Sequence, residues 1–197
     1  DSVTRIGSGA FGGMPLNSIT MPFIGQSRTI SRNSYSVLGW IFGFKSIDAV
    51  CQYFLNSYGS GMDYTHYGIP YTLKTVTLTD ETDVNAGAFY NCSSLKSVDK
   101  IPNGAIDLYC AFSYCTSLET TPYLPDGVDL LSFTFMECTS LKTVVNLPDS
   151  VTAMAGTFSN CTNITRVPAL PSKLENMNWT FMGCWSLVTA PTIPATV

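Results

Sequence analysis

The chain has 197 residues, of which 45% are hydrophobic and only 12% are charged, a composition that excludes a disordered chain. Ten lysines and arginines against fourteen aspartates and glutamates give a net charge of −4, which argues against a nucleic-acid-binding protein. The apolar runs are far shorter than the roughly 20 residues that span a bilayer, so no membrane-spanning segment is predicted.

The first predicted element, residues 3–22, is one unit of a repeat that becomes clearest further along the chain. It carries Phe11 and, three residues later, Met14 at a position where later units have a cysteine. At the other end, residues 192–197 read as the middle of a unit. We therefore expect the chain to be a piece of a longer protein, with any signal or anchor outside it.

Residues 23–68 interrupt the repeat with a predicted insert that holds ten aromatic side chains and five charged ones. Within it, Val37–Gly43 is predicted to be a strand bounded by glycines, and Ser46–Leu55 to be a short helix. Long inserts in repeat proteins tend to lie on one face, often the binding face. Two compatible interpretations stay open, namely a small subdomain packed on the flank of the repeats and a surface that contacts a ligand.

From residue 69 onward a 23-residue repeat continues to the end of the chain. One unit cannot bury its apolar side chains alone, whereas stacked units bury them against their neighbours, so the pattern predicts a solenoid. Runs such as Leu95–Val98 are expected to form one short strand per coil of a parallel sheet, and each Phe-x-x-Cys segment a short helical turn. The clearest columns are Phe89, Phe112, Phe135, Phe158 and Phe181, then Cys92, Cys115, Cys138, Cys161 and Cys184, then Leu95, Leu118, Leu141, Ile164 and Leu187, then Pro102, Pro125, Pro148, Pro171 and Pro194.

The cysteine column is expected to consist of free thiols that point into the core. No Cys-x-x-Cys pair and no neighbouring histidine occurs, so neither a zinc site nor any other metal or cofactor is predicted. Stacked coils bring the Cα atoms of neighbouring units within disulfide range, yet a small buried thiol is the better interpretation. Cys110 lies outside the column and could be exposed.

The segment Ala88–Val98 resembles the unit of BspA-like leucine-rich repeats, as do Leu73–Leu78 and Val3–Phe11. The resemblance covers roughly residues 1–22 and 69–197. It implies one right-handed leucine-rich-repeat solenoid over residues 1–197, a β-rich α/β fold with about five to six repeats after the insert. It also implies a bacterial cell-surface or secreted protein that adheres to host proteins, neighbouring cells or glycans.

The favoured function is therefore a non-catalytic binding module for an extracellular protein or glycan, with end-to-end self-association as a further possibility. One alternative is a structural spacer of a larger surface protein. A remote alternative is an enzyme that uses Cys51 and His66 as nucleophile and base. Aromatic rings of the insert would stack on sugars or form hot spots for a protein partner. The candidate ligand-contacting residues are Trp40, Tyr35, Tyr53, Tyr58, Arg28 and Arg32.

Overall fold

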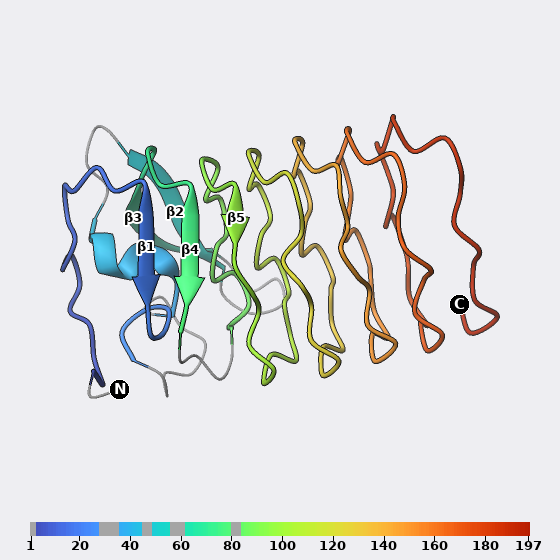
Figure 1. The fold of residues 1–197 in the computed structure, drawn as a ribbon, viewed down its shortest axis with the longest axis horizontal. Helices are drawn as coiled ribbons and strands as arrows, with labels where there is room; N and C mark the ends of the chain where they lie inside the picture. The colour runs from blue at the N-terminus through green and yellow to red at the C-terminus, as the bar shows by residue number, and fades with distance from the viewer. Residues whose placement is uncertain (1–2, 28–35, 45–48, 56–61, 80–83) are drawn as a thin grey trace.

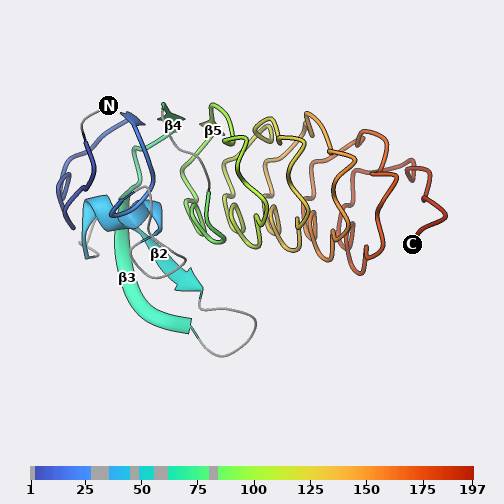
Figure 2. The ribbon, with the colours of Figure 1, turned by 90° about the horizontal axis from the view of Figure 1, so that it is seen from below.

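A computed structural model describes residues 3–27, 36–44, 49–55, 62–79 and 84–197 of the chain. The chain winds into coils that stack along one axis, so that the two ends of the chain lie at opposite ends of the stack (Figure 1). A two-stranded hairpin projects from one side of the stack near its N-terminal end (Figure 2). This is a leucine-rich-repeat type of fold, with parallel strands and very little helix.

The first coils pair through a parallel sheet of three strands. β1 (Ser18–Met21), β4 (Thr75–Leu78) and β5 (Ser97–Val98) lie in the order β1-β4-β5. The register aligns Ile19 with Val76 and Val76 with Val98. All three side chains are buried. Because side chains alternate between the two faces of a strand, this register puts one apolar column inside the stack and leaves the polar neighbours outside.

Regular strand pairing does not continue through the later coils, where the sequence analysis expected one strand per coil. Among the described residues, only single parallel bridges follow, such as the one between Thr120 and Thr143. Pro122 and Pro168 lie in the strand-side segments of the coils on either side of Thr143. A proline has no N–H to donate, so each interrupts the ladder that would otherwise form.

The Phe-x-x-Cys segments, predicted as short helical turns, are single turns closed by bonds such as Cys92 N to Phe89 O at 3.1 Å, and none of these segments forms a longer helix. The residue before each cysteine adopts a left-handed conformation, with φ of 56° at Asn91 and 61° at Glu137. Moreover, the N–H groups of the first four phenylalanines of the column donate to the next coil, as in Phe89 N to Ala111 O at 2.9 Å. Because these groups bond between coils, they are not available for the bonds of a helix.

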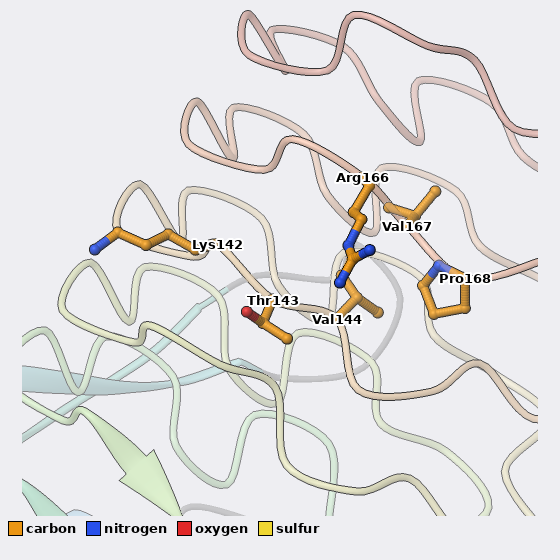
Figure 3. Close-up of a pocket in the computed structure, with 6 residues that line it drawn as sticks. All are labelled: Lys142, Thr143, Val144, Arg166, Val167 and Pro168. Atoms are coloured by element: carbon orange, nitrogen blue, oxygen red, sulfur yellow. The ribbon is translucent and has the colours of Figure 1, made fainter.

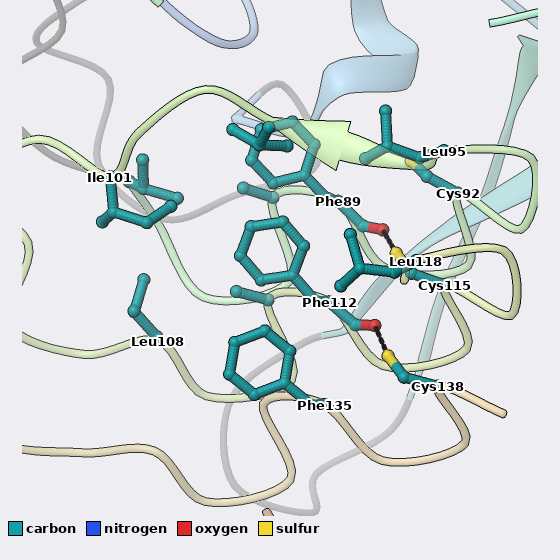
Figure 4. Packing of buried hydrophobic residues seen from close by; sticks show 14 of the residues in the cluster. Phe89, Cys92, Leu95, Ile101, Leu108, Phe112, Cys115, Leu118, Phe135 and Cys138 are labelled. Atoms are coloured by element: carbon teal, nitrogen blue, oxygen red, sulfur yellow. Dashed lines mark hydrogen bonds between the residues drawn. The ribbon is translucent and has the colours of Figure 1, made fainter. Parts of the chain in front are cut away.

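The core contains a continuous column of phenylalanine rings beside a column of thiols (Figure 4). The rings of Phe112 and Phe135 stack with centroids 5.5 Å apart, and those of Phe135 and Phe158 with centroids 5.8 Å apart. Each is fully buried. Next to them, Cys115 and Cys138 donate their S–H groups to phenylalanine carbonyls of the preceding coil, both at 3.2 Å.

The cysteines of the column are free in the structure, and the first four are buried. The prediction that Cys110 could be exposed was wrong, because its side chain is only 5% exposed. Cys110 has a φ of 54°, and its N–H donates to Ser132 O of the next coil. Its turn is therefore held against the following coil, a contact between coils that the spacing of the cysteine column does not predict.

Two elements of the predicted insert differ from expectation. The segment expected to be a strand contains a 3-10 helix, η1 (Leu38–Phe42), and the segment expected to be a helix contains β2 (Ala49–Leu55). β2 pairs in antiparallel fashion with β3 (Met62–Pro70) to form the projecting hairpin. Short apolar runs fit a strand and a buried turn equally well, so the hydrogen-bond partners of the backbone decided the outcome.

η1 takes a place inside the stack rather than beside it. The N–H groups of Gly9 and Phe11, in the first coil, donate to Trp40 O and Ile41 O of η1 at 3.0 and 2.8 Å. On the other side of η1, Leu38 N donates to Ala88 O at 2.9 Å. These are the same kinds of bond that join the Phe-x-x-Cys turns of later coils. η1 therefore stands in for the turn of one coil, and the β2–β3 hairpin is the part that leaves the stack.

Candidate functional site

The base of the hairpin is fixed to the solenoid by a buried glutamine. Gln52 on β2 is fully buried, and its Oε1 accepts a hydrogen bond from Gly39 N at 2.5 Å. Its Nε2 donates to Ala88 O at 2.9 Å and contacts Cys92 Sγ at 3.7 Å. Gly39 has no room for a side chain, because a Cβ there would lie 2.3 Å from the Cβ of Tyr67. One polar side chain thus joins β2, η1 and the next coil.

Apolar side chains gather on the surface at this base. Phe44 is 76% exposed, Tyr71 is 58% exposed and Met14 is 45% exposed. One face of the Phe44 ring stacks on the ring of buried Tyr67, with the ring centroids 6.1 Å apart. Exposed apolar side chains that gather in one place mark interaction sites more often than scattered ones do.

These side chains border a cavity of about 400 Å³ that we call the root pocket, within the size range of ligand sites. Its lining comes from the first coil, from η1 and the residues after it, and from the end of β3. None of the described residues that line it is charged, and these residues offer apolar and aromatic contact. The lining includes Gly12, Met14, Pro15, Phe44, Tyr71 and Thr72.

The structure places one of the predicted ligand-contacting side chains. Trp40, on η1, is half-buried, its Nε1–H donates to Ile6 O at 2.8 Å, and its ring meets that of Tyr67 edge to face. Its polar atom is therefore used inside the protein. Tyr53 lies on β2, with its side chain outside the described residues. Tyr35, Tyr58, Arg28 and Arg32 also lie outside the described residues.

Three side chains of the root pocket were not among the predicted site residues. Phe44 belongs to the aromatic set of the insert, but nothing in the sequence separates exposed rings from buried ones. Tyr71 lies just after the predicted insert, and Met14 was interpreted only as a replacement for cysteine. The departure of Met14 from the cysteine column was the one sequence signal that pointed to this place.

The pair considered for the enzymatic alternative lies on the hairpin. The register pairs Cys51 with Gly68 and Tyr53 with His66, so Cys51 and His66 occupy diagonal positions of the ladder. The side chain of Cys51 lies outside the described residues. In the part of the chain that the structure describes, no three histidine, cysteine or acidic side chains gather to hold a metal ion.

The thiols of the core column have pKa values that suit a structural role. Burial raises the pKa of Cys92 and Cys138 well above the ordinary value of 9.0, and the neighbouring Cys115 adds to the shift of Cys92. Burial also raises the pKa of half-buried Cys184, to about 11. Because the thiolate is the reactive form, these groups are poor nucleophiles at neutral pH.

A second depression lies between two consecutive coils on the strand side of the solenoid (Figure 3). It has a volume of about 270 Å³ and is lined by Lys142, Thr143, Val144, Arg166, Val167 and Pro168. Lys96, Glu119 and Lys142 occupy equivalent outward positions of three successive coils, 23 residues apart. The first two form an ion pair at 3.2 Å. The depression thus offers a positively charged edge and an apolar floor.

None of the helices in the described residues is long and apolar enough to span a membrane.

The family model of the BspA type leucine rich repeat region matches residues 63–188 in six copies. No curated protein matches the chain. Among solved structures, a T. pallidum leucine-rich repeat protein matches with a TM-score of 0.50 and 29% identity over 57% of this chain. A leucine-rich repeat protein from Bacteroides ovatus has a TM-score of 0.47 and 20% identity over 78% of this chain. A leucine rich cell surface protein from Faecalibacterium prausnitzii has a TM-score of 0.43 and 25% identity over 70% of this chain.

The matched part is 56% of the T. pallidum chain, 54% of the Bacteroides ovatus chain and 45% of the Faecalibacterium prausnitzii chain. This chain therefore spans about half the length of the proteins that it matches.

Proposed function

The chain belongs to the BspA-type leucine-rich repeat family, and from that premise we propose that it is a non-catalytic protein-binding module. We further propose that it acts at the bacterial cell surface or after secretion. The buried thiols of the described core column have raised pKa values and supply no reactive nucleophile. Binding is the activity that a rigid stack with an exposed apolar surface supports best.

The observation that carries this proposal is the root pocket. Phe44 and Tyr71 are rigid aromatic side chains of the type that dominates binding energy at protein interfaces. They lie exposed around a cavity of about 400 Å³, on backbone that is fixed by the Gln52 bonds and by η1. Because the Phe44 ring already stacks on Tyr67, it loses little conformational entropy when a partner binds.

The residues selected from the sequence belong to the same region of the chain. We propose that Trp40, Tyr53, Tyr35, Tyr58, Arg28 and Arg32 also contact the ligand. Glycan is the second candidate ligand, because exposed Phe44 and Tyr71 rings also suit stacking on sugars. We also propose that residues 1–197 form one domain. It would consist of a first repeat (1–22), an insert (23–68) and further repeats of 23 residues each (69–197).

The test compares binding by the chain and by a Phe44→Ala/Tyr71→Ala variant to arrays of immobilised matrix proteins and glycans. Tyr123→Ala is the matched control, since Tyr123 is 55% exposed on a distant coil. Deletion of residues 23–68 is unsuitable, because it would remove η1 from the stack. We expect the double variant to weaken binding by about 30-fold or more, the loss typical of a hot spot, and the control to bind normally.

Equal binding by the double variant would contradict the root pocket as the site. No binding by the unmodified chain would contradict the binding function and favour a structural spacer. End-to-end self-association stays a prediction, and sedimentation velocity at increasing concentration tests it.

A further inference from the structure

A longer groove runs between the same two coils as the depression in Figure 3, and we call it the coil groove. One wall is the segment 142–150 and the other is the segment 166–173. The depression of about 270 Å³ forms one end, and a hollow of about 700 Å³ continues it, with Pro168 lining both. The groove therefore follows the direction of the chain rather than crossing the coils.

The backbone along the coil groove is not paired across it. Thr143 O accepts from Thr121 N of the preceding coil at 3.0 Å, and the two residues before Val144 also bond to that coil. Among the described residues, no backbone hydrogen bond joins 144–147 to 166–170. Pro168 cannot donate, so the ladder between these coils is open at this place. Val145 N instead donates to Thr121 Oγ1 of the preceding coil at 3.0 Å, so this wall of the groove is fixed from the side of that coil.

Apolar side chains fill the middle of the coil groove. Val145 is 46% exposed, and Ala169 is also exposed. Leu147 and Pro168 are half-buried, and all four line the hollow. Small and branched apolar side chains of this kind receive the alternate side chains of an extended peptide.

Charge differs between the two ends of the coil groove. Lys142 and Arg166 lie at one end, with the guanidinium of Arg166 over Val144 (Figure 3). Neither forms an ion pair with a described residue. By contrast, Lys96, at the equivalent position two coils before Lys142, pairs with Glu119. The other end holds Asp126, Asp149 and Lys173, among which Asp149 accepts a hydrogen bond from Ser172 N at 3.1 Å. The uncompensated positive charge therefore lies at the Arg166 end.

We propose that the coil groove binds an extended segment of a protein partner that places acidic residues against Arg166 and Lys142 and apolar residues over Val145 and Ala169. Apolar contact with Val145 and Ala169 would supply affinity, and the carboxylates would fix the direction of the segment. This site is separate from the root pocket, and it adds a peptide-recognition activity to the proposed protein-binding role.

The experiment uses fluorescence anisotropy with a labelled peptide of two glutamates, then alternating valine and threonine over four positions, then leucine and lysine. We expect Arg166→Gln/Lys142→Gln to weaken binding by about tenfold or more, as for loss of charge-assisted hydrogen bonds. Lys96→Gln is the matched control, because Lys96 is also exposed but has Glu119 as its partner in the protein. Ala169→Arg should abolish binding by filling the groove while the melting temperature stays unchanged.

Phe44→Ala/Tyr71→Ala should bind this peptide normally, so that failure of the root pocket and failure of the coil groove give different results. Equal binding of a peptide with two lysines in place of the glutamates would overturn the proposal. So would unchanged binding by Ala169→Arg, or binding of a sulfated glycan with no binding of the acidic peptide.

Discussion

The side-chain amide of Gln52 donates to the backbone carbonyl of Ala88 at 2.9 Å, although the two residues belong to the hairpin and to the next coil of the stack. The same carbonyl also accepts Leu38 N at 2.9 Å. Both lone pairs of Ala88 O are thus used by residues of the segment between the first coil and the later ones. In this way the hairpin and η1 are built into the solenoid.

Gln52→Ala should therefore destabilise the whole chain. The substitution leaves the buried Gly39 N–H without its acceptor and creates a cavity, and we expect a loss of about 2–4 kcal/mol in the free energy of unfolding. Urea unfolding monitored by circular dichroism measures it. Lys142→Gln, on the exposed face, is the control and should change stability by less than about 0.5 kcal/mol. An equal effect of the two substitutions would contradict the role of Gln52.

Phe135→Ala should be the most costly kind of substitution in the stack. Its ring is fully buried between those of Phe112 and Phe158, and we expect a loss of about 3–5 kcal/mol. Phe44→Ala removes the same side chain from a position that is 76% exposed, so it should cost far less. Melting temperatures of the two variants test this, and similar values would be incompatible with the phenylalanine column.

Stability should fall as the pH rises above about 9. The thiols of the core column have pKa values raised above their ordinary value of 9.0, as in Cys138 and in Cys184, whose pKa is about 11. Above pH 9 the unfolded chain loses these protons while the folded chain keeps them, so deprotonation favours unfolding. The stabilisation is complete below pH 9 and is lost as the pH rises toward the folded pKa values.

Cys138→Ala removes one such thiol and provides the measurement. The free energy of unfolding from urea titrations at pH 7 to 11 should decline less steeply for this variant than for the unmodified protein, by up to about 1.4 kcal/mol per pH unit, because the variant lacks one thiol that loses its proton more readily in the unfolded chain. Parallel curves for the two proteins would show that the thiol does not titrate differently in the folded state.

Gly156→Ala should destabilise a turn that has no room for a side chain. Gly156 has a φ of 60°, and a Cβ there would lie 2.5 Å from ring carbons of Phe133. We expect a loss of about 1–3 kcal/mol. Gly7→Ala is a suitable control, since no atom lies within 4 Å of the added Cβ. A thermal melt of each variant decides, and an unchanged Gly156→Ala protein would be evidence against this turn geometry.

The spacing of Phe112, Phe135 and Cys138 in the sequence predicted the solenoid, the stacked core and the free thiols. A repeated apolar position has the same neighbours in every coil, so the periodicity of side chains is sufficient to infer which residues lie inside. The same reasoning failed for Cys110, whose burial depends on a turn outside the cysteine column.

Only the tertiary structure decided the form of residues 38–42 and 49–55 and the exposure of Phe44 and Tyr71. η1 forms because Gly9, Phe11 and Ala88 offer hydrogen-bond partners that lie far away in the sequence, and β2 forms because β3 returns beside it. The opening of the coil groove likewise depends on Pro168 facing the segment after Thr143 in the neighbouring coil. The sequence therefore specified what repeats, whereas contacts between distant segments specified where the stack departs from the repeat.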